Sequence, residues 1–335
     1  MPNEDHVEVA TKFITTDSNV PNSRVDVFYE REKQTLQFMR DLNHDHLIRA
    51  IATCAKGTTR CFIFPWAQGG NLADFWKNDR NRLDKHLVRW AIDQMAGISS
   101  GIMELHKKNT RHGDVKPQNI LHFLDRTLDK RGVGILKVAD VGLAKVHPEY
   151  TKYRDSTTTR QSTERYEPPE MMSYIRKEAP IPRRYDSWSL GCVFLEFLVS
   201  LVHGHVGLVK FHEDLKPSHQ ERFYEVEGNT NVRHHIVNKL IGEMEKKLLP
   251  NTALGKILEL ISKNLLVPAD KRMHTETLHI EFTKIIRKCN NRSSYYFGSG
   301  LAKLAEVRPV PGGVSDNTRP PPDDVSSLIV KISPC

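Results

Sequence analysis

Three side chains that could do chemistry lie within six residues of one another in the segment 111–121, R-H-G-D-V-K-P-Q-N-I-L. The Asp114 carboxylate can accept a proton or orient a hydroxyl group. Lys116 follows two residues later and can neutralise a phosphate. Asn119 offers a neutral oxygen of the kind that hard cations bind, and Pro117 favours a loop over a helix because it lacks a backbone donor. The segment therefore predicts a site that handles a proton, a phosphate and a metal ion.

The same segment resembles the catalytic loop of protein kinases, whose usual form is H-R-D-x-x-x-x-N. His112, Asp114 and Asn119 match that form, whereas Gly113 stands at the position of the arginine. The alternative is a polar loop that matches by chance, and the further motifs that follow in the family's order argue against it. The resemblance implies that Asp114 orients the substrate hydroxyl, Lys116 steadies the γ-phosphate of ATP, and Asn119 binds Mg²⁺.

A second segment, 135–144, reads I-L-K-V-A-D-V-G-L-A and predicts a strand that ends in Asp-Val-Gly. It resembles the D-F-G segment of kinases, with Val141 in place of the phenylalanine. The resemblance implies that Asp140 holds the Mg²⁺ ion that bridges the nucleotide phosphates. Gly142 would allow the backbone to turn tightly behind it.

Two later segments resemble structural parts of the same family. Residues 162–170 resemble the end of an activation segment, in which Thr163 would stand at the peptide-binding loop. Glu170 would pair with a distant arginine, and the candidate is Arg272; the alternative is two unrelated surface charges. Asp186 begins a segment that resembles the start of the central buried helix. There it would cap the helix and brace the catalytic loop.

The contacts to the nucleotide base and to its α- and β-phosphates are expected from the first 70 residues. Residues 9–12, V-A-T-K, resemble the kinase V-A-I-K strand, so that Lys12 would hold the α- and β-phosphates. Glu32, on the helix that follows, is the expected partner of Lys12, and Glu30 is the alternative. A lone exposed pair of this kind would otherwise have little effect on stability.

Residues 62–76 resemble the last strand of the small lobe and the hinge. This alignment places Phe64 at the gatekeeper position and Pro65, Trp66 and Ala67 in the hinge, where the backbone of Ala67 would read adenine. Together with the R-H-G-D segment, the residue pattern of this stretch resembles that of a kinase-like group of filamentous fungi.

One part of the family pattern does not precede Lys12. No G-x-G-x-x-G segment occurs there, and eleven residues are too few for the two strands and the glycine loop that cover the ATP phosphates. Either the chain is a shortened gene product or nucleotide binding is compromised. Because the amides of that loop position the transferred phosphate, both nucleotide affinity and rate are expected to be lower without them.

The elements that must position these residues change in character near residue 70. Before it, alternating apolar residues predict strands at 7–14, 47–52 and 60–64, with a helix over 28–42. After it, short strands at 120–123 and 135–138 bracket a polar loop, and helical periodicity covers 71–76, 87–105, 188–201, 231–248, 254–265 and 276–289.

The predicted fold class is α+β: a bilobal protein-kinase-like fold with a truncated small β-rich N-lobe and a mainly helical C-lobe. Residues 1–70 would form the partial N-lobe and hinge, and residues 71–290 the C-lobe. Residues 291–335 are rich in Pro, Gly, Ser and Asp, and we expect them to form a disordered tail.

Composition narrows the classes of partner and location. A net charge of +8 over 335 residues tolerates an anionic ligand, but no dense Lys/Arg stripe favours nucleic acid. Five cysteines without close pairs favour reduced thiols and an intracellular location, cytoplasmic or nuclear. The polar start is not a signal peptide.

Two further patterns are interpreted structurally. The apolar run 188–209 is interrupted by Glu196, His203 and His205, so it predicts a buried core helix and no membrane span. The histidine pairs 203/205 and 234/235 lack an accompanying zinc-site pattern, so they predict no metal site.

The sequence thus predicts a protein serine/threonine kinase that uses ATP and Mg²⁺ on a protein substrate. Gly113 removes the arginine that usually clamps a phosphorylated activation loop, so phosphorylation at 157–159 is not expected to be required. The alternative is a pseudokinase that acts as a binding or scaffolding module. A small-molecule kinase is disfavoured by the peptide-loop pattern at 162–170.

Overall fold

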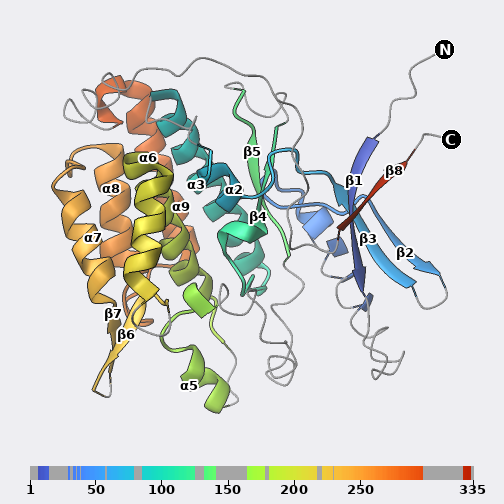
Figure 1. Ribbon diagram of the computed structural model, residues 1–335, viewed down its shortest axis with the longest axis horizontal. Helices are drawn as coiled ribbons and strands as arrows, with labels where there is room; N and C mark the ends of the chain where they lie inside the picture. Colours follow the sequence, from blue (N-terminus) through green and yellow to red (C-terminus); the bar gives the residue numbers. More distant parts are fainter. Residues whose placement is uncertain are drawn as a thin grey trace.

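The computed structural model describes residues 7–14, 29–30, 33–34, 36–37, 39–56, 59–78, 85–124, 132–140, 164–177, 181–216, 221–228, 230–296 and 327–332. A small sheet lies at one end of the molecule and most of the helices lie at the other (Figure 1). The predicted α+β class, with a small N-terminal sheet and a helical C-terminal region, is confirmed.

The small sheet has the strand order β2-β3-β1-β8, and its neighbouring strands are antiparallel. Its strands are β1 (Val7–Ile14), β2 (Ala52–Lys56), β3 (Thr59–Pro65) and β8 (Ser327–Ile332). Alternating β-branched and polar residues suit β1 to a sheet with one covered face. The register places Lys12 opposite Phe62 of β3, and Phe62 is fully buried against the ring of Tyr29. The strand that carries Lys12 is therefore fixed by the apolar interior beside it.

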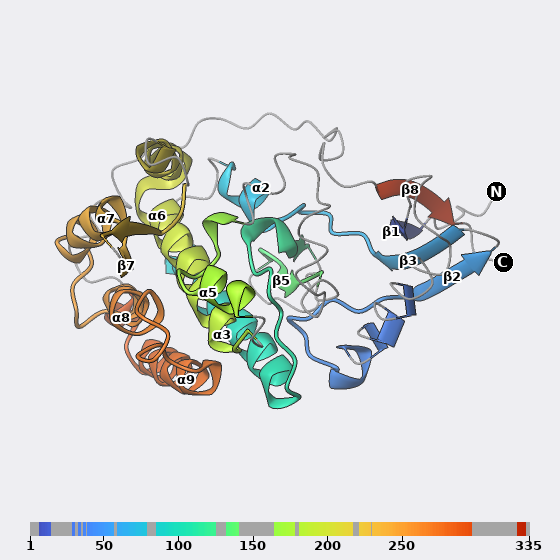
Figure 2. The ribbon, with the colours of Figure 1, turned by 90° about the horizontal axis from the view of Figure 1, so that it is seen from below.

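The helical region is built around α6 (Arg184–Leu215), which kinks at Gly204 and is buried in its first half (Figure 2). Its helices are α2 (Leu72–Trp76), α3 (Lys85–Lys107), α5 (Met171–Arg176), α6 (Arg184–Leu215), α7 (His235–Glu245), α8 (Ala253–Leu260) and α9 (Thr275–Asn291). In its first half, α6 buries nearly every side chain, because it packs against neighbouring elements on all sides. It is long and apolar enough to cross a membrane by composition, yet 61% of its most apolar stretch is buried inside the structure. This matches the predicted core helix.

Several predicted boundaries were wrong. The expected helix over 231–248 begins only at His235, because β6 (Tyr224–Glu227) and β7 (Thr230–Arg233) form a hairpin there. Gly228 has a φ of +59° in the turn, a conformation that glycine adopts without strain. The strand expected at 47–52 begins at Ala52 as β2, and Leu47 makes only a single bridge to Val138.

The expectation of reduced, unpaired cysteines was also wrong for one pair. Cys54 on β2 and Cys61 on β3 stand opposite each other, with their Cα atoms 5.0 Å apart, and form a disulfide. The pairing was missed because the sequence did not locate the hairpin turn that sets this register. Cys192 and Cys289 are free and buried.

Part of the segment 291–335, for which we expected a disordered tail, forms a strand. Residues 327–332, S-L-I-V-K-I, form β8 and pair along β1 from Val7 to Lys12. Composition over the whole segment hid this stretch, whose β-branched residues favour a strand.

Candidate active site

The centre of the predicted site lies between a buried loop and a short hairpin. The loop 111–116 leads into a single turn at Pro117–Asn119 and then into β4 (Ile120–Phe123), which pairs with β5 (Ile135–Val138). The Ala139 amide donates to the Asn119 carbonyl at 2.8 Å, so the end of β5 lies beside the catalytic loop. The sheet pairing therefore brings the Asp114 and Asp140 segments together.

Asp114, Lys116 and Asn119, the three predicted catalytic residues, meet in one buried cluster. Asn119 Nδ2 donates to the Asp114 carbonyl at 2.8 Å and to Asp114 Oδ2 at 2.9 Å. Lys116 Nζ lies 3.0 Å from the same Oδ2 atom. All three side chains are at least nine-tenths buried. Two donors therefore hold the Asp114 carboxylate in one orientation, as a group that must accept a proton from a positioned hydroxyl requires.

Asp186, at the start of α6, holds the catalytic loop through two of its backbone amides. Its carboxylate accepts the His112 amide at Oδ2 and the Gly113 amide at Oδ1, each at 2.8 Å. His106 Nε2 lies 2.7 Å from Oδ2. Burial alone would raise the pKa of Asp186, but the hydrogen bond and charge of His106, with further help from the loop, lower it below its usual value. The prediction that Asp186 braces the loop is confirmed, although its side chain makes no cap to α6.

His112 and Gly113 shape the loop between these anchors. His112 is fully buried, and its Nε2 lies 2.9 Å from the Ala139 carbonyl, which ties the loop to the end of β5. Gly113 has a φ of +81°, in the left-handed region that glycine adopts at little cost. The residue that replaces the usual arginine is therefore compatible with this backbone.

Lys12 reaches across from the small sheet to Asp140. Its Nζ lies 2.6 Å from Asp140 Oδ1, and about a third of each side chain is exposed. Burial raises the pKa of Asp140, but the charge and hydrogen bond of Lys12, with the charges of His112 and Lys116, lower it below its usual value. Asp140 has a φ of +65°, an uncommon conformation for a residue other than glycine. The structure thus joins the predicted phosphate lysine to the predicted metal carboxylate.

The predicted hinge residues connect the sheet to α2. Phe64, opposite Ala10 in the β3–β1 register, and Ala67 pack against the core. Trp66 lies between them and is partly exposed. The Ala67 carbonyl accepts the Gly70 amide at 3.0 Å, which folds the connection into a tight turn.

Gly69 lets the hinge approach β4 closely. The Gly69 amide donates to the His122 carbonyl at 3.0 Å. A side chain at Gly69 would place Cβ 2.2 Å from His122 Nδ1. The hinge is therefore fixed against the hairpin that carries Asn119.

Several predicted residues lie outside the described residues: Glu32, Val141, Gly142, Thr163 and the threonines at 157–159. Glu30, the alternative partner of Lys12, forms an exposed pair with Lys33 at 3.2 Å.

The predicted Glu170–Arg272 pair is confirmed. Its two hydrogen bonds measure 2.6 and 3.1 Å. Arg272 is almost fully buried and also donates to the carbonyls of Val267 and Arg184. The pair ties the end of the 162–170 segment to the turn before α9.

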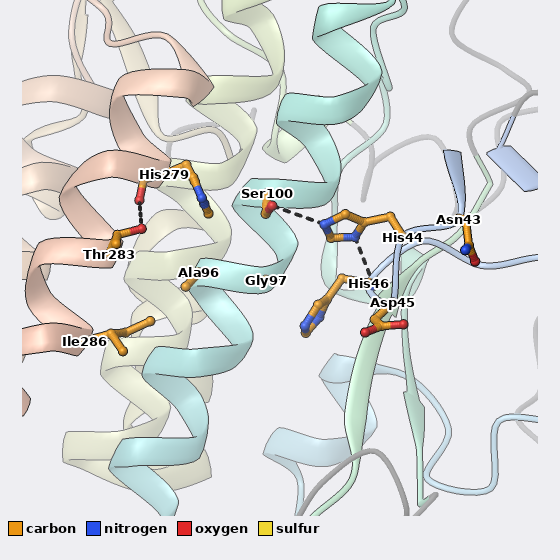
Figure 3. Close-up of a pocket in the computed structure, with 10 residues that line it drawn as sticks. All are labelled: Asn43, His44, Asp45, His46, Ala96, Gly97, Ser100, His279, Thr283 and Ile286. Atoms are coloured by element: carbon orange, nitrogen blue, oxygen red, sulfur yellow. Dashed lines mark hydrogen bonds between the residues drawn. The ribbon is translucent and has the colours of Figure 1, made fainter. Parts of the chain in front are cut away.

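The pocket in Figure 3 is separate from this cluster. It has a volume of about 340 Å³ and lies between the turn at 43–46, α3 and α9. His46 Nδ1 lies 2.8 Å from the Leu136 carbonyl, and His44 Nε2 lies 3.1 Å from Ser100 Oγ. None of the predicted catalytic residues lines it.

Comparison with known proteins decides the family. The sequence pattern of the protein kinase domain matches residues 1–278. The chain belongs to the protein kinase family.

Similar proteins include cyclin-dependent kinase-like 2 of Rattus norvegicus, which is 26% identical over 74% of this chain and 47% of its own length. The dual specificity protein kinase zakA of Dictyostelium discoideum is 27% identical over 56% of this chain and 23% of its own length. The serine/threonine-protein kinase nekl-2 of Caenorhabditis elegans is 26% identical over 50% of this chain and 46% of its own length. The chain thus spans less than half the length of each of these relatives.

Membership of the kinase family implies use of ATP with Mg²⁺, and the residues present fit that pair. Both side-chain hydrogen bonds of Asn119 come from Nδ2, which leaves Oδ1 as the oxygen for a cation. Asp140 uses Oδ1 for Lys12, which leaves Oδ2. An amide oxygen and a carboxylate oxygen are the hard ligands that Mg²⁺ prefers.

Sequence reasoning missed His106 as part of this kinase site. It lies at the end of α3, pairs with Asp186, and its Nδ1 lies 3.0 Å from Thr275 Oγ1 on α9. No local sequence pattern indicates this role of His106, because its partners lie 80 and 169 residues away. A lone histidine at the end of an apolar helix was the only available sign.

Proposed function

We propose that this kinase chain transfers the γ-phosphoryl group of ATP to serine or threonine hydroxyls of protein substrates. The observation that carries the proposal is the buried cluster in which Asn119 and Lys116 hold the Asp114 carboxylate through Oδ2. That arrangement leaves Oδ1 of Asp114 for a substrate hydroxyl. Phosphoryl transfer needs positioning and charge stabilisation more than covalent chemistry, and this cluster supplies both.

In the proposed reaction Asp114 orients the hydroxyl and accepts its proton, while Lys116 stabilises the negative charge on the transferred group. Asn119 and Asp140 would hold Mg²⁺, which supplies charge neutralisation between the phosphates. Lys12 would hold the α- and β-phosphates, with Glu32 as its partner. Phe64, Trp66 and Ala67 would frame the adenine.

The proposed preference for serine and threonine over tyrosine rests on Lys116, because a lysine two residues after the catalytic aspartate resembles the pattern of serine/threonine kinases. The relatives include both serine/threonine and dual specificity kinases, each so described for itself. The similarity to a fungal kinase-like group and the domain boundaries 1–70, 71–290 and 291–335 belong to this proposal too. Gly113 further suggests an enzyme that does not require phosphorylation at 157–159.

The test is transfer of a labelled γ-phosphate from Mg·ATP to a mixed peptide library, followed by analysis of the phosphorylated amino acids. We expect phosphoserine and phosphothreonine from the wild-type chain and loss of both in Asp140→Asn. Phosphotyrosine as the main product would refute the serine/threonine preference. Replacing 157–159 by alanine should leave the rate within about twofold of wild type, since a phosphate clamp worth one charge-assisted contact would change it more.

A second function is favoured by the direct Lys12–Asp140 pair. Asp140 Oδ1 is bonded to Lys12 at 2.6 Å, so the carboxylate expected to bind metal already has a cation. The alternative that this pair favours is a pseudokinase that binds or scaffolds. Mg·ATP binding distinguishes the kinase from the pseudokinase. A pseudokinase of this kind neither binds Mg·ATP nor transfers phosphate, and the same holds for a form of the chain extended at its N-terminus. Transfer in either form would refute the pseudokinase.

A further inference from the structure

Three side chains of the types that ligate metal ions lie together on the far side of the helical region from the small sheet. Glu225 is on β6, His234 follows β7, and His235 begins α7 (Figure 1). Glu225 Oε2 lies 2.8 Å from His235 Nδ1 and 3.8 Å from His234 Nε2. One ligating atom from each of the three residues lies within 4.8 Å of the other two. The hairpin and the start of α7 thus bring Glu225 next to the two histidines. The sequence around these residues shows no metal-binding motif.

His234 supplies the independent sign of a ligand. Its side chain is only 1% exposed, and its Nε2 atom is buried without a hydrogen-bond partner. That nitrogen lies 3.8 Å from Glu225 Oε2, which is too far for a hydrogen bond. An unsatisfied buried nitrogen beside a carboxylate and a second imidazole needs an explanation, and an ion between them is one.

We propose that Glu225, His234 and His235 bind one divalent transition-metal ion of the zinc class. Two imidazole nitrogens and one carboxylate oxygen form a donor set that suits Zn²⁺ and its neighbours Co²⁺ and Ni²⁺ more than Mg²⁺ or Ca²⁺. Three protein ligands leave a position for water or a further ligand. His235 has a side chain 68% exposed, so the ion has a route from solvent.

Metal binding would require the ring protons of His234 and His235 to change position. His234 Nδ1 accepts the Ile236 amide at 3.1 Å, which places the proton of the neutral ring on Nε2. Coordination through Nε2 moves this proton to Nδ1 and releases the Ile236 amide. His235 Nδ1 likewise gives up its hydrogen bond to Glu225, and its proton moves to Nε2. Binding therefore exchanges one weak helix cap and one hydrogen bond for metal bonds.

The position of the site suggests what the ion would stabilise. It would fasten β6 to the first residues of α7, across the β6–β7 hairpin. Asn231 in β7 donates to the Pro169 carbonyl at 3.0 Å, and Arg222 before β6 pairs with Glu164 at 3.0 Å. The ion would thus hold the hairpin that supports residues 164–170. This inference does not depend on the proposed phosphoryl transfer.

The test is metal binding by the full chain, measured by Co²⁺ absorption and by competition for Zn²⁺ with a chromophoric chelator. His235→Ala removes an exposed ligand, and His234→Asn removes the buried ligand while keeping a residue type that caps helices well. His86→Ala removes an exposed histidine outside the cluster and serves as the matched control. We expect one ion per wild-type chain and an affinity lower by about tenfold or more in each cluster variant, with no change in the control.

A second readout separates coordination from fold damage. Zn²⁺ should raise the melting temperature of wild type and of His86→Ala but not of His234→Asn or His235→Ala. Equal affinities in all four proteins would overturn the proposal, because the bound ion would then lie at other histidines. No Co²⁺ absorption in wild type would also overturn it and leave Glu225 and His235 as a hydrogen-bonded pair.

Discussion

Removing the Asp186 carboxylate should loosen the catalytic loop and destabilise the chain by an amount that the structure sets. In Asp186→Ala the amides of His112 and Gly113 and the ring of His106 lose their acceptor inside the core. A buried donor without a partner costs about 1–3 kcal/mol, and breaking a buried charged pair costs about 3–5 kcal/mol. Because the site is fully buried and water can fill only the space of the lost carboxyl group, we expect the free energy of unfolding to fall by about 4 kcal/mol.

Asp186→Asn offers a finer test, because most of the network can adapt. Asn Oδ1 can keep the Gly113 amide, and the His106 ring can change tautomer so that its Nε2 accepts from the new NH₂ group. His106 Nδ1 would then donate to Thr275 Oγ1, which lies 3.0 Å away. Only the His112 amide faces a donor, so the expected loss is about 1–3 kcal/mol. Displacement of Asp114 that follows should lower phosphoryl transfer by up to about 100-fold.

The assay is urea unfolding followed by circular dichroism at pH 7 and again at acidic pH. The pKa of Asp186 is lower in the folded chain than its ordinary value of 3.8. Its contribution is therefore fully present above pH 4 and is lost as the pH falls through the folded pKa. Asp186→Asn should lack this acid-dependent part. An Asp186→Ala variant within about 1 kcal/mol of wild type would refute the claim that this carboxylate holds the loop.

Further perturbations test the packing elsewhere in the structure. Glu170→Ala leaves the buried Arg272 guanidinium unpaired and should lower the free energy of unfolding by about 3 kcal/mol in urea titration; no measurable change would contradict the pair. Gly97→Ala should destabilise by about 1–3 kcal/mol, because its Cβ would lie 2.0 Å from His46 Nε2. Gly242→Ala, which meets nothing within 4 Å, should stabilise the helix in the same assay. Burial lowers the pKa of His46 from 6.5 to about 4, so about 3 kcal/mol of stability should be lost as the pH falls from 6.5 to 4, and His46→Gln should remove that slope.

The sequence could place Asp114, Lys116 and Asn119 together because these residues are close in the chain. Asp114, Lys116 and Asn119 fall within one turn-rich loop, so their meeting needs only local structure. The pair of Glu170 and Arg272, 102 residues apart, was predicted only through resemblance to a family. Pattern and spacing alone carry no information about such a distance.

What the sequence did not predict depends on register and long-range packing. The Cys54–Cys61 disulfide required the exact pairing of β2 with β3, and β8 required a distant segment to find the edge of β1. Helical periodicity over 231–248 hid the hairpin, because β7 is short and leads directly into α7. His106 was missed because its role comes from partners on other helices.

The measurement that tests the account most directly is single-turnover phosphoryl transfer from Mg·ATP by wild type and by Asp114→Asn, each in saturating nucleotide. Asparagine keeps the size of the side chain and can still accept from Lys116, but it cannot accept the proton of the hydroxyl. The account predicts transfer by wild type and a rate lower by about 10²–10⁴-fold in the variant, with ATP affinity unchanged. Equal rates for the two proteins would contradict the role of Asp114 and with it the proposed reaction.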